Sequence, residues 1–429
     1  MITAVRDAWI VTQDPQRRVL RGDVVIDGEK IISVGKEFKG TADKEINAAG
    51  DIVIPGLINT HTHVAMTVMK GAVDDMLFPD FLSRVFKIDS DRTEKDLDIG
   101  TRIGCAEMIR SGTTTFVDLY YSEDVIAKAV TDAGIRGVLC WCVLDEEFTT
   151  QKGNPLQNCK RFYSNFKNKR KILPGVGLQG VYVCSEDTCK GAKEFSDEKN
   201  LPLTFHLSET REEVNNHRKK TGKRPAEWLK DIDVLGKNSI AAHSAWLTIN
   251  EIKKMAEAKM SISSCPVSNM KLATGGVAPL PEFKKYGVNI TVGTDGSTTN
   301  NSLDLMAEMK ILGLLQKSSR WDPTVATAQE LLDFTTVNSA KAIGMQDSLG
   351  SIEKGKFADI VILNGKSPNL RPLLPENIIS NIVYSGSSSN VKTVLCQGDI
   401  VLEDSKIKTI DEDQVLSESE EMWRSLCLR

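Results

Sequence analysis

The stretch Pro55-Gly56-Leu57-Ile58-Asn59-Thr60-His61-Thr62-His63 has the pattern of a short buried strand that ends in two histidines. Side chains alternate between the two faces of a strand, so His61 and His63 point the same way and can bind one metal ion. Histidine is scarce, with 5 in the chain, and four of these lie where strands are expected to end. This economy favours a chemical use of histidine and predicts an enzyme with a metal site.

Beyond this stretch, short apolar segments alternate with longer helical ones, which is the pattern of parallel β/α units. Eight strands are expected, at residues 57–63, 114–119, 137–144, 175–184, 202–207, 240–246, 260–265 and 289–294. Eight such units predict a closed, TIM-type (β/α)8 barrel, in which catalytic groups lie at the carboxyl ends of the strands. Five polar side chains fall at or just beyond such ends: His61, His63, His206, His243 and Asp295. We therefore expect them to share one site.

The two ends of the chain differ from the middle, because both contain short strands separated by turns. Residues 24–28 near the start and 394–402 near the end are examples. We predict that both ends pair into one small β-sandwich domain beside the barrel. The predicted regions are 1–54 and 348–410 for this domain, 55–347 for the metal-dependent barrel, and 411–429 for a C-terminal helix packed on the body.

The composition limits the classes of function. The chain has 429 residues, 41% hydrophobic and 26% charged, which suits one large domain and a smaller one. A net charge of -4 gives no basic field, so we expect neither nucleic acid nor an anionic membrane as a partner. No apolar run is long enough to span a bilayer, and no secretory signal pattern is present. The 9 scattered cysteines favour free thiols in the cytoplasm.

The candidate ligands are of the types that catalytic zinc sites use. His61, His63, His206 and Asp295 offer nitrogen and oxygen donors, and such a site leaves one position for water. The ion lowers the pKa of that water enough to supply hydroxide near neutral pH. We expect one divalent ion, namely zinc, with ferrous iron as the alternative, because both accept imidazole and carboxylate ligands. Any one of these histidines alone would be read as an ordinary core residue, but the four residues together favour the metal.

Two further residues are candidates for moving protons. Glu209 follows His206 by three positions, and a carboxyl group beside a metal in a dry pocket can shuttle a proton. The alternative for Glu209 is a charge at a helix N-terminus, because residues 210–213 have the pattern of a helix start. His243 is a candidate ligand of a second metal or a hydrogen-bond donor to the activated water. The fifth histidine, His217, lies in a charged stretch and is predicted to be at the surface.

These motifs resemble the amidohydrolase superfamily over nearly the whole chain. The resemblance rests on residues 55–63, 206–209, 242–243, 265–272 and 293–296. Within the superfamily, the sequence is most similar to 5'-methylthioadenosine/S-adenosylhomocysteine deaminases and to the neighbouring triazine hydrolases. That similarity is carried by residues 59–63, 71–75, 206–210 and 300–304.

The resemblance implies one divalent metal bound by His61, His63, His206 and Asp295. Activated water would attack the amine-bearing carbon of a heteroaromatic ring, while Glu209 protonates a ring nitrogen. Asp295 would pass a proton from the water to the leaving ammonia, and His243 would hydrogen-bond the water. The implied reaction replaces the amino group of an adenine nucleoside by oxygen, with methylthioadenosine, S-adenosylhomocysteine, 5'-deoxyadenosine or adenosine as the small-molecule substrate. Relatives of this kind also imply a homo-oligomer, either a dimer or a tetramer.

Three positions depart from the pattern of these deaminases in the expected substrate pocket. Asp80 stands where a glutamate binds the ribose hydroxyls, and Gln179 stands where a histidine ends the fourth strand. An arginine expected after residues 134–136 is missing, and Trp141 is expected to form a more apolar or stacking wall. Arginine is well matched to carboxylates, so its absence bears on recognition of the homocysteine carboxylate. Together with Glu209, these residues form the predicted substrate-binding set.

Two other functions stay open at this point. A related hydrolase would use the same hydroxide on another amino- or chloro-substituted ring of the triazine, pterin or guanine type. A non-catalytic interaction protein of the same fold is the remote alternative. The second is disfavoured because none of the expected metal ligands is missing from the sequence.

Overall fold

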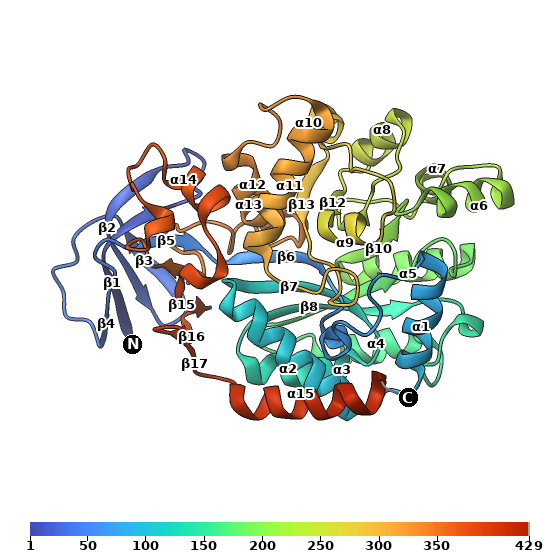
Figure 1. The fold of residues 1–429 in the computed structure, drawn as a ribbon, viewed down its shortest axis with the longest axis horizontal. Helices are drawn as coiled ribbons and strands as arrows, with labels where there is room; N and C mark the ends of the chain where they lie inside the picture. Colours follow the sequence, from blue (N-terminus) through green and yellow to red (C-terminus); the bar gives the residue numbers. More distant parts are fainter. Residues whose placement is uncertain (428–429) are drawn as a thin grey trace.

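The middle of the chain forms a barrel of parallel strands (Figure 1). We analysed a computed structural model, which describes residues 1–427. Adjacent strands follow one another along the chain and pair in parallel. They are β6 (Leu57–Thr62), β7 (Thr113–Tyr120), β8 (Arg136–Val143), β9 (Ile172–Leu178), β10 (Leu203–Leu207), β11 (Ser239–His243), β12 (Ser261–Ser264) and β13 (Asn289–Val292). The predicted TIM-type barrel is confirmed.

The barrel closes where β13 meets β6. Asp295 N donates a hydrogen bond to His61 O at 2.9 Å, and the Thr60 hydroxyl donates to Val292 O at 3.0 Å. Gly293 allows this close approach, because a Cβ atom at that position would lie 2.7 Å from His61 Cβ. The closure therefore brings the end of the first barrel strand against the end of the last one.

An outer layer of helices covers the barrel (Figure 1). Three of them begin with a capping box, in which a threonine and an acidic residue bond each other's backbone amides. The helices are α1 (Phe78–Ser90), α2 (Glu94–Arg110), α3 (Glu123–Ala133), α4 (Pro155–Phe166), α5 (Glu186–Lys199), α6 (Arg211–Thr221), α7 (Pro225–Asp231), α8 (Ile249–Glu257), α9 (Pro266–Lys271), α10 (Leu280–Tyr286), α11 (Leu305–Arg320), α12 (Ala328–Thr335) and α13 (Val337–Ala342). The 3-10 turn η1 (Val64–Met69) directly follows β6.

The two ends of the chain share one mixed sheet beside the barrel (Figure 1). Its strands run in the order β17-β16-β15-β14-β5-β1-β2-β3, with β4 paired to β1. The halves join where β5 and β14 pair antiparallel. The bounds are β1 (Ile2–Val11), β2 (Val19–Asp27), β3 (Lys30–Val34), β4 (Lys44–Asn47), β5 (Ile52–Pro55), β14 (Ile360–Leu363), β15 (Val391–Cys396), β16 (Asp399–Glu403) and β17 (Lys406–Ile407). The predicted pairing of the two ends is confirmed, and the domain boundaries at residues 54, 347 and 410 stay predictions.

The last helix, α15 (Glu412–Cys427), lies along α2 on the outside of the barrel (Figure 1). Arg102 on α2 bonds Glu418 at 2.6 Å, and Trp423 Nε1 donates to Lys70 O at 2.9 Å. The helix therefore also braces the segment that follows β6. Of the helices within residues 1–427, none is both long and apolar enough to cross a bilayer.

Two expectations from the sequence are wrong. The fourth strand, expected over residues 175–184, ends at Leu178, because residues 181–183 form a turn before α5. His217 is predicted at the surface but is 6% exposed, with its ring edge against Trp228 at a centroid distance of 5.1 Å. Most residues around His217 are charged, so the sequence around it resembles that of a surface helix. One face of α6 nevertheless packs inward and carries His217.

Arg136, at the start of β8, links the barrel to the mixed sheet. Its guanidinium donates to Asp359 at 2.5 and 3.3 Å, to Gln397 Oε1 at 2.9 Å and to Thr115 Oγ1 at 3.0 Å. Arg136 is 1% exposed and Asp359 is 6% exposed. The ion pair is thus buried away from water, and each charge is neutralised mainly by the other.

Replacing Arg136 with methionine is expected to lower the free energy of unfolding by about 3–5 kcal/mol, because Asp359 is left as an uncompensated buried charge. Urea unfolding followed by circular dichroism measures the loss. The control is Arg21→Met, which removes the exposed pair between Arg21 and Asp7 and is expected to change little. Equal losses for the two variants would contradict the assignment of Arg136 as the link.

Candidate metal centre

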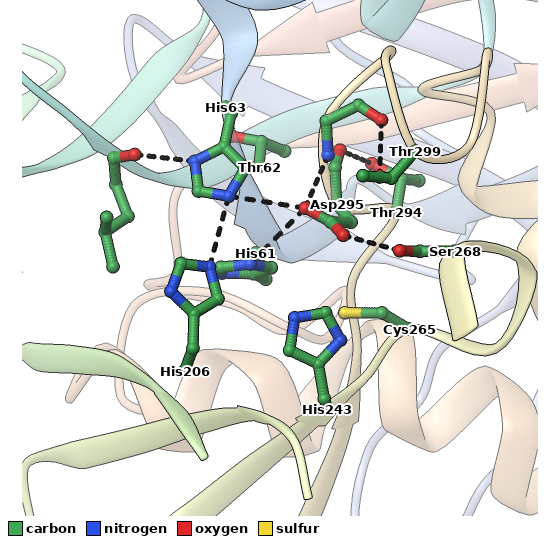
Figure 2. A network of polar contacts seen from close by, with 12 residues as sticks. His61, Thr62, His63, His206, His243, Cys265, Ser268, Thr294, Asp295 and Thr299 are labelled. Atoms are coloured by element: carbon green, nitrogen blue, oxygen red, sulfur yellow. Dashed lines mark hydrogen bonds and ion pairs between the residues drawn. The ribbon is translucent and has the colours of Figure 1, made fainter. Parts of the chain in front are cut away.

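Four histidines and one aspartate converge at the carboxyl ends of the barrel strands (Figure 2). His61 lies in β6 and His63 follows that strand. His206 lies in β10, His243 ends β11 and Asp295 follows β13. The ends of four strands, β6, β10, β11 and β13, therefore supply one cluster, at the place where barrel enzymes carry their catalytic groups.

The donor atoms of this cluster lie within reach of a single ion. Ring nitrogens of His61, His63 and His206 lie within 4.8 Å of one another. His206 Nε2 is 3.2 Å from His63 Nε2. Asp295 Oδ1 is 3.3 Å from His63 Nε2 and 3.6 Å from His61 Nε2. The structure thus brings together all four of the ligands predicted from the sequence.

Backbone carbonyls orient two of the histidines. His63 Nδ1 lies 2.6 Å from Leu119 O, and His206 Nδ1 lies 2.6 Å from Gln179 O. A ring nitrogen that bonds a carbonyl carries the proton, so Nε2 of each ring presents its lone pair to the cluster. Sequence reasoning missed both carbonyls, because every residue has a main-chain carbonyl and the residue type does not show which of them bonds a histidine.

The histidines fit a divalent metal. Both ring nitrogens of His61 are buried without a hydrogen-bond partner among residues 1–427, which is costly unless an ion or other ligand binds there. Burial and the neighbouring imidazoles hold the pKa of His61 well below its usual value and lower the pKa of His206 to about 3. Both rings are therefore neutral near pH 7, which is the form that binds metal.

Asp295 is held as a carboxylate by its neighbours. It is 3% exposed, and burial alone would raise its pKa, but its contact with His63 and the electrostatic effect of His243 and His61 keep that pKa well below its usual value. Ser268 Oγ donates to Asp295 Oδ2 at 2.6 Å, and Gly296 N donates to Oδ1 at 2.7 Å. Ser268 lies within the motif at residues 265–272, yet no role for it could be read from the sequence.

Glu209 and His243 form the other side of the cluster. Glu209 Oε2 lies 3.7 Å from His243 Nε2, and the rings of His61 and His243 are 5.5 Å apart. Burial raises the pKa of Glu209 above its usual value. A carboxyl group whose pKa is raised is better suited to act as a general acid.

The predicted substrate-binding residues are only partly brought together. Besides orienting His206, Gln179 accepts a weak hydrogen bond from Cys142 Sγ at 3.4 Å. Trp141 is not brought to the cluster, because its ring packs on Phe162 of α4 and its Nε1 donates to Gln151 at 2.8 Å. Strand residues alternate faces, so the next residue, Cys142, takes the position expected for Trp141.

Asp80 lies in the first turn of α1 and is exposed. Its carboxylate makes no hydrogen bond or ion pair with residues 1–427 and is open to solvent. A further carboxylate, Asp118 on β7, was missed by sequence reasoning. Its Oδ1 accepts from Thr62 Oγ1 at 2.6 Å and Val64 N at 2.7 Å, and burial raises its pKa to about 6. Asp118 therefore fixes the turn that carries His63.

Solved structures of two hydrolases resemble this fold over nearly their whole length. An adenosine deaminase from Xanthomonas campestris, determined with bound zinc, is 26% identical, with a TM-score of 0.95, over 99% of this chain and 98% of that one. A triazine hydrolase from Arthrobacter aurescens is 21% identical, with a TM-score of 0.91, over 98% of this chain and 99% of that one. The likeness to the triazine hydrolase shows the fold alone.

Sequence relatives cover nearly the whole chain as well. A 5'-deoxyadenosine deaminase of Methanosphaera stadtmanae is 37% identical over 96% of this chain and 96% of its own. A 5-methylthioadenosine/S-adenosylhomocysteine deaminase of Pyrococcus furiosus is 36% identical over 96% of this chain and 98% of its own. The profile of the amidohydrolase family matches residues 52–401, which include the whole cluster. The chain therefore belongs to the amidohydrolase family.

Proposed function

We propose that this protein is a metal-dependent hydrolase that replaces the ring amino group of an adenine nucleoside by an oxygen from water and releases the amino group as ammonia. The observation that carries the proposal is the convergence of three imidazoles and the Asp295 carboxylate near a largely buried carboxyl group, that of Glu209. The relatives named as deaminases of 5'-deoxyadenosine and of methylthioadenosine support the same reaction.

His61, His63, His206 and Asp295 would hold the ion. We propose zinc, which the similar adenosine deaminase structure contains, with ferrous iron as the alternative. When bound, such an ion lowers the pKa of water enough to supply hydroxide near neutral pH. Metal analysis of protein purified without added zinc distinguishes the two metals.

The chain's own groups would carry the protons. The Glu209 carboxyl would donate a proton to the ring nitrogen beside the carbon under attack, and it would regain one from the hydroxyl group of the addition product as that oxygen becomes the carbonyl. The Asp295 carboxylate would take a proton from the attacking water and give it to the departing amine, which leaves as ammonia. His243, 3.7 Å from Glu209, would orient the water by a hydrogen bond. Asp80 and Gln179 are proposed to contact the nucleoside, whereas Trp141 is left out because it packs against α4.

The test is ammonia release by the zinc-loaded protein from S-adenosylhomocysteine, methylthioadenosine, 5'-deoxyadenosine and adenosine in parallel. Turnover of at least one of the four is expected, and the order among them shows whether a carboxylate on the substrate is recognised. No ammonia from any of them would contradict the proposal. Release of chloride, an alkylamine or ammonia from triazines, pterins or guanine instead would identify the alternative hydrolase.

We also propose a homo-oligomer, dimer or tetramer, in the reducing cytoplasm. The nine cysteines are all free thiols and all buried, which supports a compartment that does not form disulfides. Light scattering on a sizing column measures the assembly, and a monomer at micromolar concentration would contradict the first part of this proposal. Fractionation of cells of the source organism tests the second part.

Replacing Ser268 with alanine is expected to lower kcat about 10-fold with unchanged zinc content, because hydrogen bonds to charged groups contribute about 1.5–3 kcal/mol. The Asp295 Oδ2 atom loses its 2.6 Å donor in this variant. The control is Ser263→Ala, which removes a buried hydroxyl that contacts Thr60 and not Asp295. An equal fall of kcat in both variants would contradict a specific role of the Ser268 hydroxyl at Asp295.

A further inference from the structure

The loop between β10 and α6 carries Glu209, and hydrogen bonds fix its main chain. Ser208 is fully buried and left-handed, with a φ of 49°. Its carbonyl oxygen accepts a hydrogen bond from Trp246 N at 3.0 Å, and Leu207 O accepts one from Ser244 N at 3.0 Å. The loop that leaves β10 is therefore tied to the loop that leaves β11, so one side of the peptide bond between Ser208 and Glu209 is held by the barrel.

Glu213 holds the other side of the same peptide bond. Its Oε2 accepts a hydrogen bond from Glu209 N at 2.8 Å, and its Oε1 accepts one from Ser208 N at 2.9 Å. Both oxygens of one carboxyl group are thus occupied by two successive backbone amides. With the Ser208 carbonyl bonded to Trp246, every polar group of this peptide unit has a partner.

This arrangement differs from an ordinary helix cap. In a capping box, the acidic residue at the third helical position bonds the amide of the N-cap residue. The N-cap of α6 is Thr210, whose Oγ1 accepts from Glu213 N at 3.0 Å. The Glu213 side chain reaches beyond Thr210 to the two amides before it, so it serves the loop as well as the helix.

Helix stability alone does not account for this second carboxyl group beside Glu209. Burial and the negative charge of Glu209 raise the pKa of Glu213 to about 7. Two carboxyl groups in one shielded site each disfavour the ionised form of the other, and a helix start can be capped without that cost. Both Glu213 oxygens accept hydrogen bonds from the amides of Ser208 and Glu209, which lie in the loop. The Glu213 carboxyl group therefore stabilises the conformation of this loop.

We propose that Glu213 is a positioning residue, whose carboxyl group fixes the Ser208–Glu209 peptide so that the Glu209 side chain faces the metal centre beside His243. The inference rests on the proposed function, in which Glu209 donates the proton. A proton donor must lie within hydrogen-bond reach of its acceptor, and a misplacement of about 1 Å can cost about 10²-fold in rate. Glu213 would act only through Glu209 and would not touch the nucleoside.

The first test is the variant Glu213→Gln, in which one acceptor oxygen becomes an amide nitrogen that cannot accept a hydrogen bond. We expect kcat to fall about 10- to 100-fold, with KM changed less than about threefold and zinc content unchanged. The matched control is Glu212→Gln on the exposed face of the same helix, which is expected to keep the wild-type kcat. A Glu213→Gln variant within about twofold of wild type would overturn the proposal.

The second test separates positioning from a general structural role. In a Glu209→Gln background, adding Glu213→Gln is expected to lower the residual kcat by less than about twofold, because the group that Glu213 positions has already lost its function. A general weakening of the fold would reduce the rate by the same factor in both backgrounds. Losses that multiply would therefore overturn the proposal.

Crystal structures of the wild type and of Glu213→Ala test the same point without a substrate. We expect Ser208 to leave its left-handed conformation in the variant and the Glu209 carboxyl group to move away from His243. An unchanged loop would overturn the proposal. A wild-type enzyme that releases no ammonia from any adenine nucleoside would overturn the proposed function instead, and the two crystal structures would still decide the role of Glu213.

Discussion

Replacing Glu209 with glutamine is expected to lower kcat for ammonia release by about 10³-fold, within the range that general acid catalysis supplies. Glutamine has nearly the same shape but has no carboxyl proton to give to the ring nitrogen. The residue is 14% exposed at its side chain and lies 3.7 Å from His243, so the substitution is accommodated without disturbing the fold. Steady-state kinetics with the best of the four adenine nucleosides measures the loss.

Measuring the zinc content of the Glu209→Gln variant shows whether a lower kcat comes from the missing acid or from a missing metal ion. Glu209 is not among the predicted ligands, so Glu209→Gln is expected to bind as much zinc as the wild type. Glu212→Gln, an exposed neighbour three residues along the chain, serves as the control for charge at this end of α6. A Glu209→Gln variant that keeps more than about a tenth of the wild-type kcat would remove Glu209 from the role of general acid.

The barrel and the convergence of the histidines with Asp295 could be predicted because both follow from simple periodicities. Strand alternation places His61 and His63 on one face, and the order of the β/α units places His206 and Asp295 at the same end of the barrel. No knowledge of packing was needed for either step. The structure brings these residues within contact distance, with Asp295 Oδ1 3.3 Å from His63.

The rest of the site depends on features that residue types do not encode. The carbonyls of Leu119 and Gln179 orient two histidines, but any residue could supply them. Trp141 was placed one residue away from the inward-facing position, and a shift of one along a strand reverses the face. Ser268 and Glu213 act on other side chains or on amides, so their roles appear only once the loops are folded.

Helical periodicity explains why His217 is predicted at the surface but lies in the core. The neighbouring residues on α6 are charged, and only the helical period reveals that Val214 and His217 share a buried face. A core histidine that packs on Trp228 and not on the cluster is nonetheless useful. It provides a residue of the same type, similarly buried, that contributes nothing to the metal centre.

Replacing His206 with alanine is expected to remove bound zinc and to lower kcat by at least about 10⁴-fold, because without the ion the pKa of water would no longer be lowered toward neutrality. His206 is 5% exposed, and its Nε2 lies 3.2 Å from that of His63. The substitution therefore removes one of the four donor atoms expected to bind the ion. Elemental analysis of dialysed protein measures the zinc, and ammonia release measures the activity.

The control for His206→Ala is His217→Ala, which removes a buried imidazole from α6. His217 packs on Trp228 and contacts none of the cluster residues, so this variant is expected to keep its zinc and most of its kcat while losing some stability. If His206→Ala kept a full complement of zinc, the ligand set would have to be drawn from His61, His243 and Asp295 instead, whose donor atoms also lie within 4.8 Å of one another. Zinc retained together with a low kcat would place His206 beside the metal as an orienting group, and zinc lost together with activity would establish it as a ligand.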